Sequence, residues 1–103
     1  MILIVDMNYE KESLAYNEFV APIVSVIEPL EVCEVRHFLE LEPQKLDQYS
    51  KIVLSGTTLK DFVVLKHVQK FGWLKTYSNP ILGICSGLQI ISVVFGEPLK
   101  DCL

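Results

Sequence analysis

The sequence predicts an α/β domain with a parallel β-sheet at its centre. Short apolar runs alternate along the chain with segments whose apolar residues recur every three or four positions, and this alternation is typical of strands joined by helical crossovers. Half of the 103 residues are hydrophobic and 21% are charged, as expected for a chain that covers both faces of a sheet. A chain of this length forms one domain at most, and a small one for this class of fold.

The first half of the chain supplies two strands and one helical segment. The run Ile2–Val5 is wholly apolar, which predicts a central strand buried on both faces. A helix should follow, because four apolar residues recur at helical spacing: Tyr16, Val20, Ile23 and Ile27. Pro22 should kink or restart this helix, since proline has no N–H to donate within it. Residues 30–38 mix apolar and charged side chains, which indicates an edge strand, and residues 40–50 form a connection.

The second half supplies two more strands, each followed by a helical pattern. The third strand, Lys51–Leu54, stops at a turn, and residues 59–77 are expected to form a helix that Gly72 interrupts. The fourth strand, Pro80–Gly83, is followed by a strongly apolar helix over residues 88–95. Right-handed crossovers between these elements predict a flavodoxin-like, three-layer sandwich with a parallel sheet of strand order 2-1-3-4.

Functional groups are expected at the carboxyl ends of these strands, as in other open α/β sheets. Asp6 ends the first strand, residues 55–57 follow the third, and Cys85 follows the fourth. The parallel arrangement should bring all three positions to one edge of the sheet.

The most informative stretch of the chain is residues 80–89, Pro-Ile-Leu-Gly-Ile-Cys-Ser-Gly-Leu-Gln. A strand, a cysteine with a glycine two residues away on each side, and an apolar helix follow in the order of a nucleophile elbow. Gly83 and Gly87 would remove side chains that collide with the strained turn, and Cys85 would stand at a helix N-terminus, which favours a thiolate. The alternative is that Cys85 is a small buried residue in a tight turn.

A thiol nucleophile needs an oxyanion hole, and two groups are candidates for its donors. One is the backbone N–H of Ser86, directly after the nucleophile. The other is an N–H of the Gly56–Thr57 turn on the neighbouring strand. The same turn can equally well be a strand-ending turn with Thr58 as the N-cap of the next helix.

These residues resemble the class I glutamine amidotransferase family, whose elbow reads Gly-Ile-Cys-x-Gly-x-Gln. Residues 83–89 match every fixed position, and the strand ending at Asp6 and the strand and turn over residues 52–56 are also similar to that family. The resemblance implies that Cys85 forms a γ-glutamyl thioester with glutamine, without a cofactor or metal. It also implies oxyanion donors at Ser86 and the Gly56–Thr57 turn, a substrate-side role for Gln89, and a synthetase subunit or domain that accepts the ammonia.

The sequence departs from the family pattern in three places. The family usually has Gly-Gly-Pro after the third strand where this chain has Gly56 followed by two threonines, and Leu88 stands where relatives often have His or Met. The family's catalytic His and Glu lie in a His-x-Glu signature downstream. Residues 1–103 are therefore expected to be an amidotransferase-like domain truncated after the elbow helix and inactive on its own. His37 and His67 lie outside any family motif, are expected to be ordinary, partly exposed histidines, and receive no catalytic role.

Composition excludes several other classes of function. The net charge of −4 and the lack of a Lys/Arg cluster argue against nucleic-acid binding. The apolar runs are too short to cross a membrane. Cys33, Cys85 and Cys102 form no Cys-x-x-Cys pair, so neither a disulfide framework nor a metal site is expected, and a reducing cytoplasm is the expected location.

Two other functions remain open. A DJ-1/PfpI-like cysteine hydrolase would share the elbow but typically has His directly after the nucleophile, where this chain has Ser86, and lacks the counterpart of Gln89. A non-enzymatic, flavodoxin-like assembly module is the third reading. Residues 90–95 are apolar nearly all round, so self-association or a partner chain is expected over this helix.

Overall fold

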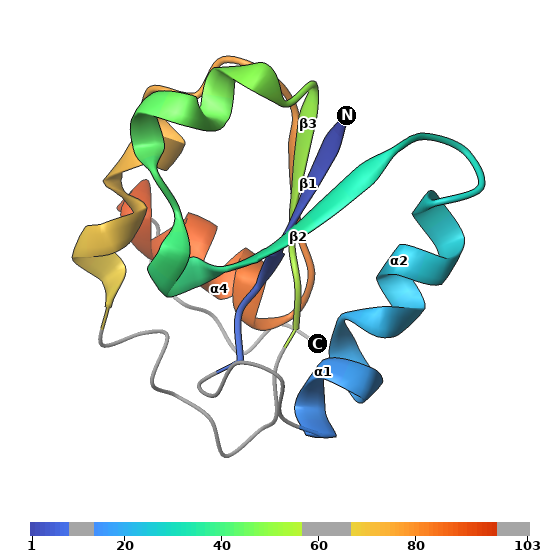
Figure 1. Cartoon of the computed structure of the whole chain (residues 1–103). Coiled ribbons are helices and arrows are strands. Elements are labelled where there is room, and N and C mark those ends of the chain that lie inside the picture. Colours follow the sequence, from blue (N-terminus) through green and yellow to red (C-terminus); the bar gives the residue numbers. More distant parts are fainter. Residues whose placement is uncertain (9–13, 57–66, 97–103) are drawn as a thin grey trace.

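Figure 1 shows the computed structural model of the chain, in which helices cover both faces of a four-stranded sheet. The structure describes residues 1–8, 14–56 and 67–96, with the side chains of residues 14–16 outside the described part. All strand pairs are parallel and the order is β2-β1-β3-β4, which confirms the predicted fold class and strand order. The strands are β1 (Ile2–Asp6), β2 (Cys33–His37), β3 (Lys51–Leu54) and β4 (Ile81–Gly83).

The sheet is the middle layer of three. One face carries the helices α1 (Leu14–Phe19) and α2 (Ala21–Ile27). The other face carries three 3₁₀ segments and the last helix: η1 (Phe38–Glu40), η2 (Pro43–Gln48), η3 (Val68–Lys75) and α4 (Ser86–Val94). The first and the last of the described α-helices, α1 and α4, therefore lie on opposite faces of the sheet.

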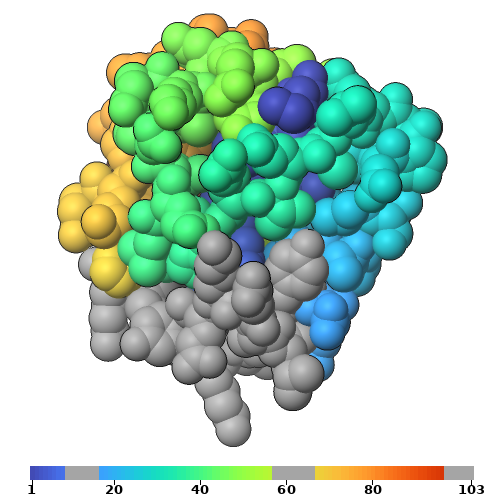
Figure 2. Space-filling view, in the orientation of Figure 1, coloured from blue at the N-terminus to red at the C-terminus, as the bar shows by residue number. Residues whose placement is uncertain are grey.

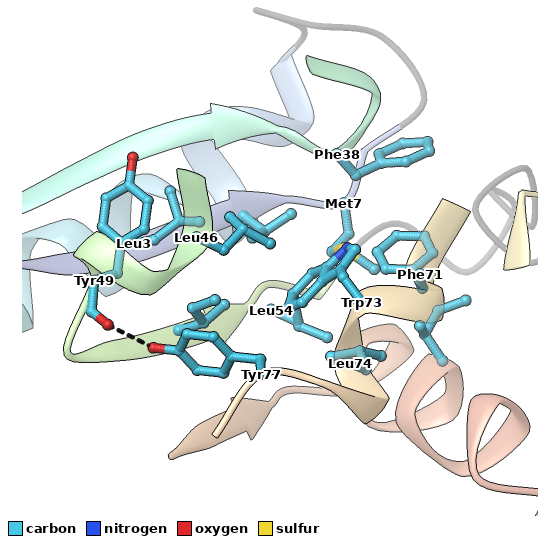
Figure 3. Close-up of a cluster of buried hydrophobic side chains, with 13 residues drawn as sticks. Leu3, Met7, Phe38, Leu46, Tyr49, Leu54, Phe71, Trp73, Leu74 and Tyr77 are labelled. Atoms are coloured by element: carbon cyan, nitrogen blue, oxygen red, sulfur yellow. Dashed lines mark hydrogen bonds between the residues drawn. The ribbon is translucent and has the colours of Figure 1, made fainter. Parts of the chain in front are cut away.

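The central strand β1 is buried along its whole length, as its apolar sequence predicts. Because side chains alternate along a strand, Ile2 and Ile4 pack under α2 while Leu3 and Val5 belong to the core on the opposite face. This opposite-face core is the larger of the two. Aromatic side chains of η3 fill it, and the Tyr77 hydroxyl donates a hydrogen bond of 2.8 Å to the backbone oxygen of Tyr49 (Figure 3).

Proline restarts the first helical segment, as predicted. α1 ends at Phe19, and α2 begins at Ala21 with Pro22 in its first turn, where the missing N–H of proline breaks no helical hydrogen bond. The buried Val20 between the two helices anchors the break in the core under β1.

The expected α-helix over residues 59–77 is wrong in its described part. Residues 57–66 lie outside the described residues, and residues 68–75 form a 3₁₀ segment in place of an α-helix. Hydrogen bonds reach back three residues, for example from Thr76 N–H to Trp73 O, and this spacing buries Phe71 and Leu74 on one side. Gly72, whose low helix propensity weakens an α-helix, lies in the middle of the segment.

Figure 2 shows the side of the molecule on which β2 and η2 lie, and residues of both elements line a hollow there. The hollow has a volume of about 560 Å³, and Glu34, Arg36 and Tyr49 are among its lining residues. The Tyr49 hydroxyl donates to the Glu34 carboxylate and the Arg36 guanidinium lies 2.9 Å from it. Both contacts lower the pKa of Glu34, and the hydrogen bond from Tyr49 has the larger effect. The pKa of Tyr49 is raised, mainly because its hydroxyl is buried.

Within the described ranges, no helix is long and apolar enough to cross a membrane. The same ranges contain no cluster of His, Cys, Asp and Glu side chains that could hold a metal ion.

Candidate active site

Cys85 occupies the turn between β4 and α4, and its backbone conformation is unusual. Its φ is 52° and its ψ is −110°, and no other non-glycine residue of the described ranges has a positive φ. A side chain held in such a conformation costs on the order of 1–3 kcal/mol, which the surrounding structure must supply. The thiol is exposed. The turn therefore presents the Cys85 thiol to solvent at the carboxyl end of the sheet.

The two glycines that flank this turn allow close contact between α4 and the strands beneath it. A Cβ on Gly83 would lie 2.7 Å from the backbone of Gly87 and of Leu88, and a Cβ on Gly87 would lie 2.5 Å from the Leu54 carbonyl oxygen. Both distances are far below a van der Waals contact. The spacing of these glycines around Cys85 thus has a steric cause that the structure makes explicit.

Gly56, two residues after the end of β3, lies beside Cys85. A Cβ placed on Gly56 would be 3.5 Å from Cys85 Cβ and 3.3 Å from Phe19 Cδ1. The end of the third strand and the Cys85 turn therefore meet as expected, whereas Thr57 lies outside the described residues. Nothing in the sequence singles out Phe19, because it falls off the apolar stripe that defines the first helical segment.

Ser55 is fully buried and ties the end of β1 to the turn beside Cys85. Its hydroxyl accepts a hydrogen bond of 3.0 Å from the Met7 N–H and donates one of 3.0 Å to the Gly56 carbonyl. Its backbone N–H donates to Val5 O at 3.1 Å. The Ser55 side chain thus links the residue after β1 to the turn after β3, at the carboxyl end of the sheet.

The buried polar side chains of the described residues all gather at this edge or at the start of α4: Asp6, Asn8, His37, Ser55 and Ser86. His37 Nδ1 accepts a hydrogen bond from the Leu39 N–H at 3.2 Å, so Nε2 carries the proton and donates to the Asn8 carbonyl at 2.6 Å. The Asn8 side-chain amide in turn donates to Asp6 at 2.8 Å. The network joins the end of β2 to the end of β1.

His37 is less exposed than the sequence predicts, and its hydrogen bonds bear on whether it can act as a base for Cys85. His37 is only 5% exposed, so its description as a partly exposed histidine is wrong; its position as the last residue of β2 carries it into the buried edge. Both of its ring nitrogens are already used. His67 is half-buried beside Phe38, with ring centroids 5.8 Å apart, and its Nδ1 has no hydrogen-bond partner among the residues that the structure describes. Neither histidine forms a hydrogen bond with Cys85.

The first turn of α4 carries the other two predicted site residues. Gly87 N–H donates to Ile84 O and Gln89 N–H donates to Cys85 O, whereas within the described ranges the Ser86 N–H has no backbone acceptor outside its helix. The Gln89 side chain is exposed. Cys33 is half-buried on β2, at the opposite end of the strand order from Cys85, and Cys102 lies outside the described residues.

Replacing Ser55 with alanine is expected to lower the free energy of unfolding by about 1–3 kcal/mol, because the buried Met7 N–H loses its acceptor. Urea denaturation of both proteins measures the difference. Ser25→Ala is the matched control, since the Ser25 hydroxyl is exposed and bonds only within its own helix, and should change stability by less than about 0.5 kcal/mol. Equal effects of the two substitutions would contradict this role of Ser55.

Comparison with known proteins agrees with the arrangement of these residues. The sequence profile of the glutamine amidotransferase class-I family matches residues 15–101. A curated relative, the cobyric acid synthase of Synechococcus sp. (strain JA-3-3Ab), is 37% identical over 57 residues, which are 53% of this chain and 12% of that protein. The chain thus corresponds to a small part of that relative's length. No solved structure matches the chain.

The family match spans most of the chain and includes the α1–α2 segment, the Ser55–Gly56 turn and the Cys85 turn. The chain belongs to the class-I glutamine amidotransferase family.

Proposed function

We propose that this domain is a glutaminase module in which Cys85 removes ammonia from glutamine and supplies it to a synthetase. The observation that carries the proposal is the exposed thiol of Cys85, held at a positive φ between β4 and α4 beside Gly56. We interpret this turn as a nucleophile elbow, because a strand, a strained residue and a helix follow one another in that motif. We place the reaction in the cytoplasm, where thiols stay reduced.

The proposed chemistry has two halves. The Cys85 sulfur attacks the side-chain carbonyl carbon of glutamine, the C–N bond breaks, and ammonia leaves with a proton that the thiol has lost. Water then attacks the γ-glutamyl thioester, the C–S bond breaks, and glutamate and the thiol are released. In both halves a negative charge develops on the carbonyl oxygen. We assign its stabilisation to the N–H of Ser86 and to an N–H of the Gly56–Thr57 turn, and a substrate-side role to Gln89.

Both halves need a base, and the described histidines do not provide one. His37 uses both ring nitrogens within the Asp6–Asn8 network, and His67 makes no hydrogen bond to Cys85. The 103 residues contain no His-x-Glu sequence. We therefore propose that the His and Glu of that family signature act on Cys85 from outside these residues.

A chloromethyl ketone in which CH₂Cl replaces the amide nitrogen of L-glutamine tests the proposal. Its reaction with Cys85 forms an S–CH₂ bond and expels chloride, so it records binding and nucleophile position without a full catalytic cycle. We expect intact mass and peptide mapping to show labelling of Cys85, faster for the L form than for the D form, and no such adduct in Cys85→Ser. Equal rates for the two enantiomers, or preferential labelling of Cys33, would contradict the proposal.

We further propose that the chain associates with itself through the β4–α4 side. β4 is the last strand of the sheet, and three apolar side chains there are largely exposed: Leu82 at 58%, Leu88 at 47% and Phe95 at 52%. An exposed apolar surface beside an open strand edge favours association. Light scattering at high micromolar concentration should show a species larger than the monomer, and Leu82→Asp should reduce it. A monodisperse monomer would contradict this proposal.

A further inference from the structure

We propose that Phe19 forms an apolar wall of the glutamine site and determines specificity for the length of the substrate side chain. The inference rests on the proposed function, because it assigns a substrate contact at the same nucleophile. Phe19 and Cys85 both lie close to Gly56.

The distances around Gly56 place the ring beside the nucleophile. The Cβ position of Gly56 is 3.3 Å from Phe19 Cδ1 and 3.5 Å from Cys85 Cβ. Both side chains therefore contact the same point, one from α1 and the other from the β4–α4 turn. Gly56 does not have the positive φ that would demand glycine. Its lack of a side chain instead lets the Phe19 ring pack closely against Gly56 beside the Cys85 turn.

Phe19 is not needed to complete the core. Its neighbour Val20 is fully buried and packs with Ile4 and Val53, whereas Phe19 is only half-buried and belongs to neither of the two core clusters that the described residues form. The residues before it, Asn17 and Glu18, are exposed. A large aromatic ring that is partly exposed, beside an exposed thiol, is available to a ligand.

The substrate has a segment that suits such a wall. Glutamine carries two methylene groups between its α-carbon and the amide carbonyl that Cys85 attacks. An apolar ring can cover these methylenes but offers no hydrogen bond to the charged α-amino and α-carboxylate groups, which must be bound elsewhere. Removing one to two methylenes from water corresponds to a roughly five- to tenfold effect on binding. A side chain one methylene shorter would lose part of this contact.

The test compares the glutamine chloromethyl ketone, its homologue with one methylene fewer, and iodoacetamide, which has no side chain to cover. In the unmodified protein the longer ketone should label Cys85 faster than the shorter one. Phe19→Ala should slow labelling by the longer ketone about five- to tenfold and remove most of this length preference, with iodoacetamide labelling changed less than about twofold. Phe19→Leu, which keeps an apolar wall, should retain most of the rate.

Controls separate the possible outcomes. Val26→Ala removes an apolar side chain that is 69% exposed on α2 and should leave all three rates unchanged. Should Phe19→Ala fail to fold, Phe19→Gln offers a long but polar replacement with the same expected loss.

Equal slowing of the ketone and iodoacetamide would overturn the inference, since Phe19 would then act only by supporting the Cys85 turn. So would an unchanged length preference in Phe19→Ala or Phe19→Gln. In either case a persistent preference for the L ketone would leave the proposed function standing, whereas its absence in the unmodified protein would overturn the proposed function itself.

Discussion

Replacing Gly87 with alanine is expected to lower the free energy of unfolding by about 3 kcal/mol or more, comparable to severe overpacking of a core. The new Cβ would lie 2.5 Å from the Leu54 carbonyl oxygen and 2.7 Å from Leu54 Cβ. These atoms belong to the buried end of β3, so α4 must move away from the sheet to relieve the clash. Such a movement would also displace the Cys85 turn. Urea denaturation measures the stability loss.

The chain provides a matched glycine for this experiment. A Cβ on Gly72 would meet nothing within 4 Å, and its φ is not in the positive range that strains other residues. Gly72→Ala should therefore be neutral or stabilise the domain by about 0.4–1 kcal/mol, through the reduced freedom of the unfolded chain. Gly83→Ala, whose Cβ would lie 2.7 Å from the backbone of α4, should behave like Gly87→Ala. Similar stabilities for the Gly72 and Gly87 variants would show that α4 does not pack on β3 as described.

The purified 103-residue chain is expected to release ammonia from glutamine no faster than its Cys85→Ser variant does. Formation of the thioester requires a group that accepts the thiol proton, and its breakdown requires one that activates water. The loss of the base in comparable nucleophile–base sites reduces turnover on the order of 10⁴- to 10⁶-fold. Coupled detection of ammonia over hours, with both proteins at equal concentration, measures the residual rate.

This prediction is separate from the labelling of Cys85, because alkylation needs only an accessible sulfur and a bound side chain. Turnover by the unmodified chain that Cys85→Ser abolishes would show that a base acts within these 103 residues. His37→Gln and His67→Gln would then identify it. His37→Gln is the less informative of the two, because it also breaks the hydrogen bonds to Asn8 and Leu39.

The elements that the sequence predicts correctly are those with a local signature. Three apolar runs and the mixed segment over residues 30–38 predict the four strands. The wholly apolar Ile2–Val5 marks the centre of the sheet because it must be covered on both faces. The restart at Pro22 follows from the chemistry of one residue. The steric limit on Gly83 is likewise local, since its neighbours lie in the helix that directly follows it, whereas the limit on Gly87 comes from Leu54 at the end of β3.

The features that escape the sequence depend on contacts between distant segments. His37 is buried because the end of β2 lies beside the end of β1. Its hydrogen-bond partner there, Asn8, is 29 residues away along the sequence. The 3₁₀ form of residues 68–75 depends on packing Phe71 and Leu74 into the core, which periodicity alone does not reveal. Phe19 becomes a candidate site residue only because the fold brings α1 close to Gly56. No feature of the adjacent sequence indicates that it lies near Cys85.

The most direct test of the role of Cys85 is the alkylation rate of each cysteine, measured by peptide mapping after timed iodoacetamide treatment with and without L-glutamine. Cys85 is exposed, whereas Cys33 is half-buried and packs against the core under α2. We therefore expect Cys85 to react faster than Cys33, and L-glutamine, but not D-glutamine, to slow the reaction of Cys85 alone. Faster reaction of Cys33, or a Cys85 rate that L-glutamine does not change, would contradict the assignment of Cys85 as the glutamine-binding nucleophile.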